Sequence, residues 1–157
     1  MNADSAKASE NPATLRYTLV TCSNYKFAID IGSIQEVLAY FRLTRVPNAK
    51  PYVSGVFNLR GKIYSVINMG RLLEIDDKKI AENPMIMLVG KQHDIVGIMV
   101  DQVNDMISIE NKDIHHPVGD DLPVVFRRYI SGYCELDENR IYIMDIASLI
   151  NQNLQYN

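Results

Sequence analysis

Features typical of membrane proteins are missing from this 157-residue sequence. It contains no stretch of 18 apolar residues, so no segment can span a bilayer as a helix. The first 13 residues lack the apolar core of a secretory signal peptide. We therefore expect a cytoplasmic protein without direct membrane insertion. Residues 1–13 are polar and without periodicity, and we expect them to form a disordered tail.

Motifs of common enzyme classes are missing as well. The sequence has neither a GxGxxG loop for a dinucleotide nor a GxSxG turn for a nucleophilic serine. Gly90-Lys91 resembles the end of a phosphate-binding loop, but Met85 stands at the upstream glycine position and Gln92 replaces the required Ser or Thr. We interpret this segment as a hairpin turn, and we predict no catalytic residue.

Histidines and cysteines are too few and too scattered to indicate a metal site. His115 and His116 are adjacent, and neighbouring residues of an extended chain point to opposite sides, so the pair does not easily share one ion. His93 falls in a predicted turn. Cys22 and Cys134 lie in separate strand-like runs and are expected to be buried free thiols of a reducing compartment. No metal or cofactor is predicted.

Charge gives no sign of a catalytic or nucleic-acid site either. The carboxylate pairs Asp76-Asp77, Asp120-Asp121 and Asp137-Glu138 fall in predicted loops or turns, where solvation is expected. The net charge is -3, whereas a protein that binds a phosphate backbone needs a basic face. No nucleic-acid partner is predicted.

The sequence does contain many short runs rich in Val, Ile, Tyr and Phe, separated by turn residues. Such runs are typical of strands in a mostly β protein. The predicted strands are Leu15–Cys22, Tyr25–Ile31, Ile34–Tyr40, Tyr52–Leu59, Ile63–Asn68, Met85–Val89, Ile95–Val100, Met106–Ile109, Tyr129–Leu136 and Arg140–Met144. Short helices are predicted over Met69–Leu73 and Ala147–Leu154.

The two halves of the chain repeat one pattern. Tyr17–Ile29 parallels Ile86–Ile98, which stands 69 positions later, and Tyr52–Gly55 parallels Tyr129–Gly132, which stands 77 positions later. Ile63-Tyr64 matches Ile141-Tyr142 with one residue inserted. Five short strands in each half favour two small β-barrels packed together, because closure removes exposed edges. We therefore expect one domain over residues 14–157, with barrel subdomains at about 14–80 and 81–150 and a C-terminal helix.

Three segments carry a resemblance to a known family. They are Ile34–Val37 (IQEV), Thr44–Asn48 (TRVPN) and Gly55–Gly61 (GVFNLRG), and they resemble the CheW family in order and spacing. The resemblance runs from about Leu15 to Leu154. It implies two intertwined five-stranded, SH3-like barrels with short helices, in agreement with the internal repeat.

The resemblance also implies a function and partners. CheW-like proteins are non-enzymatic adaptors that couple chemoreceptors to the histidine kinase CheA in chemotaxis. The implied partners are the regulatory domain of a CheA-type kinase and the cytoplasmic signalling tip of a chemoreceptor. The implied receptor-binding residues, in a groove between the subdomains, are Ile34, Glu36, Gly55, Arg60 and Val103. The kinase is expected to contact apolar residues at a barrel edge, mainly in the second subdomain.

The repeat sharpens this hypothesis, because duplicated halves should share what the fold needs and differ where function lies. Arg60 corresponds to Asp137, and Glu36 corresponds to Asp105. We expect Arg60 to bind a receptor carboxylate or to be held by Glu36; the alternative is a solvated loop arginine. Asn58 and Gly61 are expected to shape the turn, with Gly61 supplying a backbone angle that a larger residue would strain.

The sequence also departs from the family pattern and leaves alternatives open. The family's DLR-like turn is replaced by Asn68–Arg71, and Leu38–Tyr40 replaces a more polar stretch. Both changes bear on which receptor class the protein serves. The alternatives are an adaptor of a non-flagellar pathway, such as pilus or gliding motility, and a small-ligand-binding barrel. An enzyme on the same scaffold is a further alternative.

Overall fold

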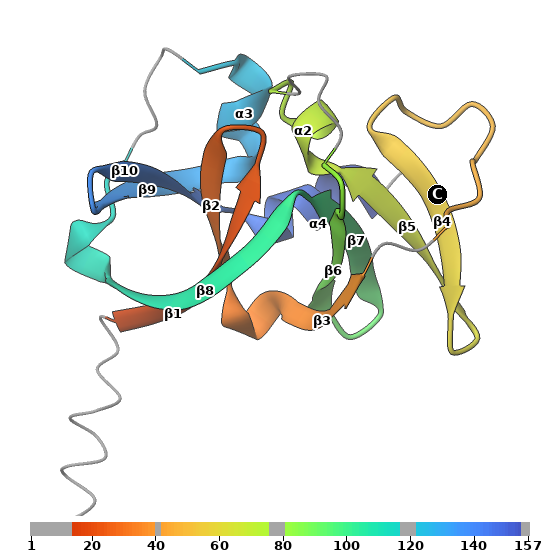
Figure 1. The fold of residues 1–157 in the computed structure, drawn as a ribbon, viewed down its shortest axis with the longest axis horizontal. Coiled ribbons are helices and arrows are strands. Elements are labelled where there is room, and N and C mark those ends of the chain that lie inside the picture. The colour runs from red at the N-terminus through yellow and green to blue at the C-terminus, as the bar shows by residue number, and fades with distance from the viewer. Residues whose placement is uncertain (1–13, 40–41, 76–80, 117–121, 155–157) are drawn as a thin grey trace, which may run out of the picture.

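Ten β-strands make up most of the chain that the structure describes, which is residues 14–39, 42–75, 81–116 and 122–154 (Figure 1). In this computed structural model the strands are β1 (Thr14–Cys22), β2 (Tyr25–Asp30), β3 (Ile34–Ala39), β4 (Val53–Leu59), β5 (Lys62–Asn68), β6 (Met85–Lys91), β7 (Asp94–Val100), β8 (Gln102–Glu110), β9 (Ile130–Leu136) and β10 (Asn139–Met144). The helical segments are η1 (Ile31–Ser33), α2 (Met69–Leu72), η2 (Asn111–Asp113), α3 (Val124–Tyr129) and α4 (Ile146–Leu154).

All ten predicted strands are present. The largest difference is at β8, which begins at Gln102 although its start was predicted at Met106. The sequence between them is polar because β8 is an edge strand, so that Asn104 and Asp105 face solvent while Val103 turns inward. A half-exposed edge strand therefore resembles a loop in the sequence.

The strands form two five-stranded sheets, and each sheet combines strands from both halves of the chain. Sheet 1 has the order β8-β1-β2-β10-β9, and sheet 2 has the order β3-β6-β7-β5-β4. The chain crosses from sheet 1 to sheet 2 at η1 and returns between β7 and β8, at Asp101. The predicted division at residues 80 and 81 is therefore wrong, since sheet 2 takes the whole stretch from β3 to β7. The repeat is intertwined because each half gives its first two strands to one sheet and its last three to the other.

The register of the strands confirms the internal repeat. β1 pairs with β2 so that Tyr17 faces Asp30, and β6 pairs with β7 so that Ile86 faces Met99, which is the same pairing 69 residues later. The hairpins β4–β5 and β9–β10 match pair for pair with a separation of 77 residues. Tyr64 therefore corresponds to Ile141, and the predicted one-residue insertion is wrong.

Each sheet closes on itself as a small barrel through one bridge. In sheet 2, Thr44 continues the course of β3 and pairs with Val56 of β4. In sheet 1, His115 follows β8 and pairs with Tyr133 of β9. These bridges join the two edge strands of each sheet, and so they satisfy backbone groups that an open edge would expose.

Three apolar clusters stabilise this arrangement. Each barrel has its own core, with Tyr17, Ala28, Ile109, Cys134, Ile141 and Ile143 in sheet 1 and Phe57, Val66, Ile86 and Leu88 in sheet 2. A larger cluster joins the two sheets and includes Val20, Phe27, Val89 and Ile98. Alternate residues of β1 and β6 thus enter a barrel core and the shared core, which explains why these strands are apolar on both faces.

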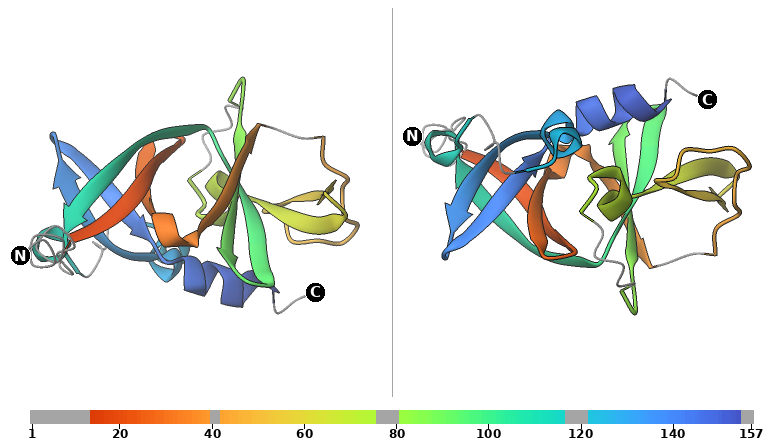
Figure 2. Two further views of the ribbon diagram at one scale, coloured as in Figure 1. Left: turned by 90° about the horizontal axis from the view of Figure 1, so that it is seen from below. Right: turned by 90° about the horizontal axis from the view of Figure 1, so that it is seen from above.

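Equivalent caps start the helices that end each repeat. The Asn68 side chain accepts a hydrogen bond from Arg71 N at 3.1 Å, and the Asp145 side chain accepts one from Ser148 N at 3.0 Å. α4 is longer and packs against β6 and β7, lying across the boundary between the sheets (Figure 2). No helix in the described part of the chain is long and apolar enough to cross a membrane.

Some predictions concern residues that the structure does not describe. The tail 1–13, Asp76-Asp77 and Asp120-Asp121 all fall outside the described ranges. Cys22 and Cys134 are within them, and both are buried free thiols, as predicted. Burial raises the pKa of Cys134, with Glu135 and Asp113 adding to the effect, so this thiol is a poor nucleophile.

Candidate functional site

A tight turn at Arg60 and Gly61 ends the β4–β5 hairpin. Both residues have left-handed backbone angles, with φ of 51° and 85°. The Asn58 side chain accepts a hydrogen bond from Gly61 N at 3.0 Å and so holds the turn from inside. A Cβ on Gly61 would meet no atom within 4 Å, so glycine is favoured there by the backbone angle and not by space.

Arg60 reaches from this turn to Glu36 on β3. Its Nη1 and Nη2 donate to the two carboxylate oxygens of Glu36 at 2.9 and 3.1 Å, a two-pronged ion pair. Glu36 therefore holds Arg60, and binding of a receptor carboxylate by Arg60 stays a prediction. The hydrogen bond from Arg60 lowers the pKa of Glu36 and raises that of Arg60. The Arg60 side chain is still 71% exposed, so the pair lies on the surface and remains accessible to a partner.

The second repeat has no counterpart of this pair. Asp105 and Asp137 stand at the equivalent positions, and both carry the same charge. The ion pair of the β9–β10 hairpin instead joins Arg140 to Glu135, along the hairpin itself, at 3.0 Å. The link between a hairpin tip and the edge strand β3 is therefore specific to the first repeat.

Ile34 and Val103 occupy equivalent places at the starts of β3 and β8. Ile34 pairs with Val89, and Val103 pairs with Val20, which are themselves equivalent positions. Both side chains are half-buried and pack against the core that the two sheets share. They present apolar surface at the boundary between the barrels, where the groove was predicted.

Gly55 lies apart from the ion pair. It is buried on β4 with φ of 148°, and a Cβ there would lie 2.6 Å from the carbonyl oxygen of Thr44. Gly132, its counterpart, meets the carbonyl of His115 in the same way, at 2.7 Å. Because both repeats contain this contact, Gly55 is needed for the bridge that closes the barrel. A direct receptor contact of Gly55 remains a prediction.

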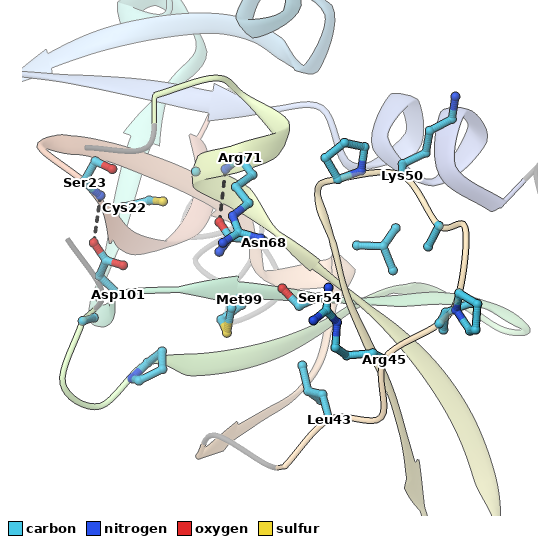
Figure 3. A pocket seen from close by; sticks show the side chains of 18 of the residues that line it. Cys22, Ser23, Leu43, Arg45, Lys50, Ser54, Asn68, Arg71, Met99 and Asp101 are labelled. Carbon is cyan, nitrogen blue, oxygen red and sulfur yellow. Dashed lines mark hydrogen bonds between the residues drawn. The ribbon is translucent and has the colours of Figure 1, made fainter. Parts of the chain in front are cut away.

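A cavity of about 1110 Å³ opens between the loop that connects β3 to β4, the α2 turn and the β1–β2 turn (Figure 3). The side chains that line it include Cys22, Ser23, Leu43, Arg45, Lys50, Ser54, Asn68, Arg71, Met99 and Asp101. Ile34, Glu36, Arg60 and Val103 are not among its lining residues.

This cavity was not predicted from the sequence, where Thr44–Asn48 was noted only for its family resemblance. A usable signal was the charge of residues 42–51, which contain Arg42, Arg45 and Lys50 but no acidic residue. The helix α3 was missed as well, although Pro123 immediately before Val124 is a common helix start.

The described residues contain no cluster of three or more His, Cys, Asp or Glu that could hold a metal ion. His115 packs against Tyr133 with ring centroids 5.2 Å apart and planes tilted by 40°. The Arg140 Cζ lies over the Tyr133 ring, 4.3 Å from its centroid. His116 forms a short contact with the carbonyl of Ser131. The two histidines thus have different partners.

Comparisons with known proteins agree with this architecture. A family model described as the CheW-like domain matches residues 16–154. The chemotaxis protein CheW of Thermotoga maritima is 30% identical over 131 residues, covering 80% of each chain, and that of Klebsiella aerogenes is 28% identical over 135 residues, covering 86% of this chain and 81% of its own. The crystal structure of the scaffolding protein TtCheW from Thermoanaerobacter tengcongensis has the same fold, with a TM-score of 0.75 at 23% identity over 83% of this chain and 88% of that one. Since the family model spans nearly all of the described residues, the chain belongs to the CheW-like domain family.

Proposed function

We propose that this protein is a non-enzymatic adaptor that couples chemoreceptors to a CheA-type histidine kinase in chemotaxis. The observation that carries the proposal is the CheW-like domain match over residues 16–154, together with relatives named chemotaxis protein CheW along most of their length. An adaptor needs rigid surfaces more than a reactive centre, and two barrels fused through a shared apolar core provide such surfaces.

The receptor surface of this proposal is the region of Ile34, Glu36, Gly55, Arg60 and Val103. Ile34 and Val103 supply apolar area at the boundary of the barrels, and Gly55 keeps the barrel closed beneath it. The Glu36–Arg60 pair supplies the charged part of the surface. Its pre-formed geometry lets Arg60 meet a receptor carboxylate without ordering a free side chain on binding.

The kinase surface of this proposal is the exposed edge of a barrel. Val37 on β3 and Met106 on β8 are equivalent in the repeat, both lie on edge strands, and they are 39% and 60% exposed. Exposed apolar residues on an edge strand favour docking of another barrel. Met106, in the second half, is the stronger candidate for contact with the kinase regulatory domain.

The cellular location that we propose for this protein follows from its proposed partners. An adaptor of this kind works in the cytoplasm and associates with membrane receptor arrays only through the receptor signalling tip and the kinase. The same architecture suits an adaptor of a non-flagellar pathway, and the genes that neighbour its own would distinguish the two. A small-ligand-binding barrel is disfavoured because side chains such as Phe57, Val66 and Ile86 fill the barrel core.

The direct test is calorimetric titration of the protein with the regulatory domain of its cognate CheA-type kinase, and then with a receptor signalling fragment. Saturable one-to-one binding of both is expected. If a folded sample binds neither, the adaptor proposal is wrong for these partners.

A further inference from the structure

The edge strand β3 contains one residue more than β6 where the two strands pair. Ile34 pairs with Val89. Glu36 pairs with the preceding residue of β6, Leu88, so Gln35 is the extra residue of a β-bulge. In a regular strand, residues two positions apart point to the same side of the sheet. Neighbouring residues of β6 point to opposite sides, so the bulge turns Ile34 and Glu36 to opposite sides as well.

These two sides are the ones that the candidate site uses. Val89 belongs to the core that the two sheets share, and Ile34 packs against this core. Leu88 belongs to the core of the sheet 2 barrel, and on this side Glu36 meets Arg60 from the β4–β5 turn. Without the extra residue, Ile34 and Glu36 would lie on the same side, and one of them would lose its present partners.

The side chain of Gln35 holds the bulge in place. Its Nε2 donates a hydrogen bond to the carbonyl of Gly90 on β6 at 2.8 Å. Gly90 lies one residue beyond Val89, where the pairing of β3 with β6 ends. The side-chain amide therefore satisfies a carbonyl that the backbone of a longer strand would satisfy.

The equivalent pairing of β1 with β8 satisfies this carbonyl with the backbone. Thr21 stands 69 positions before Gly90, and its carbonyl accepts a hydrogen bond from Asp101 N at 3.0 Å. Gly32 is the counterpart of Asp101, but its N–H donates to the Asp30 side chain at 3.1 Å. This second contact caps η1, which carries the chain from sheet 1 to sheet 2. A side chain thus replaces the backbone donor that η1 has taken away.

The bulge itself occurs in both pairings. Asn104 and Asp105 of β8 lie opposite the single residue Leu19 of β1, and Asn104 is the counterpart of Gln35. The Oδ1 of Asn104 accepts a hydrogen bond from the Thr21 hydroxyl at 2.8 Å, a contact between two exposed side chains. The bulge therefore belongs to the fold, whereas its attachment to a backbone carbonyl through a side chain belongs to β3, beside the Glu36–Arg60 pair.

We propose that Gln35 is a positioning residue of the receptor surface, which fixes the bulge so that Ile34 and Glu36 keep the orientations that a receptor meets. This inference rests on the proposed function, of which the receptor surface is a part. The hydrogen bond of Gln35 is partly buried, whereas the ion pair of Glu36 with Arg60 is exposed. The shielded contact can thus hold the backbone from which an exposed ion pair projects.

Three variants test this role. Gln35→Met keeps nearly the same length of side chain and has no N–H to donate. Thr21→Val is the matched control, since it removes the hydrogen bond to Asn104 in the equivalent pairing and leaves β3 unchanged. Gln35→Asn is a second test if Gln35→Met unfolds, because it keeps the amide on a side chain that is one methylene too short to reach Gly90. Thermal unfolding of each variant establishes whether the fold is intact.

The first readout is the pKa of Glu36, measured by NMR titration of its carboxyl carbon in the protein without a partner. In Gln35→Met this pKa should rise toward its value in Arg60→Ala, because the carboxylate is no longer held against the guanidinium. In Thr21→Val it should equal the wild-type value. An unchanged pKa of Glu36 in a folded Gln35→Met variant overturns the positioning role.

The second readout is calorimetric titration with the receptor fragment. Gln35→Met should weaken binding by about three- to tenfold. Thr21→Val should stay within about twofold of the wild type, because its hydrogen bond is exposed and no ion pair depends on it. The inference is also overturned if Gln35→Met raises the pKa of Glu36 and yet binds the receptor fragment as the wild type does. A wild-type protein that binds no receptor fragment contradicts the proposed function, and the pKa of Glu36 then still decides whether Gln35 positions that side chain.

Discussion

The hairpins β4–β5 and β9–β10 share a backbone and differ in what their tips do. Both turns have two residues with left-handed angles, Arg60-Gly61 in one and Asp137-Glu138 in the other. In the first hairpin the side chain of Arg60 extends away from the turn and forms an ion pair with Glu36 on the edge strand β3. In the second, the charged pair stays within the hairpin, where Arg140 binds Glu135 and lies over Tyr133.

This comparison distinguishes features that both repeats need in order to fold from features that only one repeat has and that we connect with function. The strand register and the helix caps recur in both repeats, so they belong to the fold. The tip charge does not recur, and the segment before the fourth strand is a loop over residues 47–52 but the helix α3 over residues 124–129. Substitutions at equivalent positions can therefore measure the two contributions separately.

The largest expected effect comes from Phe126 on α3, which is fully buried and packs against Tyr142 with ring centroids 4.9 Å apart. Phe126→Ala should lower the free energy of unfolding by about 3–5 kcal/mol, because it removes a buried ring and leaves a cavity. The equivalent change Ala49→Gly should cost no more than about 1 kcal/mol. Chemical denaturation of both variants is the measurement, and similar losses would show that residues 47–52 and 124–129 are not opposites in packing.

Substitutions of the two buried glycines, Gly55 and Gly132, should lower the stability of the protein by similar amounts. Gly55→Ala and Gly132→Ala each place a Cβ against a backbone carbonyl, and each should lower the free energy of unfolding by about 1–3 kcal/mol. The same denaturation experiments measure both losses. If Gly55→Ala instead leaves stability unchanged and only weakens receptor binding, Gly55 belongs to the binding surface.

Variants at the two hairpin tips should differ in their affinity for the receptor fragment and not in their stability. Arg60→Ala should weaken binding of the receptor fragment by about tenfold, since it removes the two-pronged cation, and should leave thermal unfolding unchanged. Asp137→Ala serves as the matched control and should bind like the wild type. Normal binding by Arg60→Ala, or its unfolding, would contradict the role assigned to this arginine.

Substitutions of the second residue in each hairpin turn should change the free energy of unfolding in opposite directions. Gly61→Ala forces a side chain into a left-handed angle and should destabilise the protein by about 1 kcal/mol. Glu138→Gly relieves the same strain at a φ of 66° and should raise the free energy of unfolding by up to about 1 kcal/mol. Thermal unfolding of both variants decides whether the two turns are under the same constraint.

The smallest effect concerns pH. Because Arg60 holds the pKa of Glu36 below its usual range, the pair stabilises the folded state above the ordinary glutamate pKa of about 4.3. That contribution is lost as the pH falls through the lowered pKa. NMR titration of the Glu36 carboxyl carbon should show a pKa that rises toward the ordinary value in Arg60→Ala. An unchanged pKa would mean that the pair does not persist in solution.

Much of the fold could be predicted from the sequence because its signals are local. Short apolar runs located every strand, and the repeat of Tyr17–Ile29 in Ile86–Ile98 is confirmed by the equivalent pairing of their strands. The limits were the edge strand β8, whose polar face resembles a loop, and α3, a helix too short to show a period. The turn built by Asn58 and Gly61 was predicted because glycine and asparagine have specific backbone roles.

The sequence by itself determined the repeat, the strand content and the special tip at Arg60, since each depends on neighbours along the chain. Only the tertiary structure decided that β3 joins β6 and that β8 joins β1, because a duplicated pattern fits either copy equally well and buries the same faces. The Glu36–Arg60 pair and the cavity beside Ala49 follow from that pairing. The ion pair forms when the barrel of sheet 2 closes and brings β3 beside the β4–β5 turn, whereas the cavity also needs Cys22 and Ser23 of sheet 1.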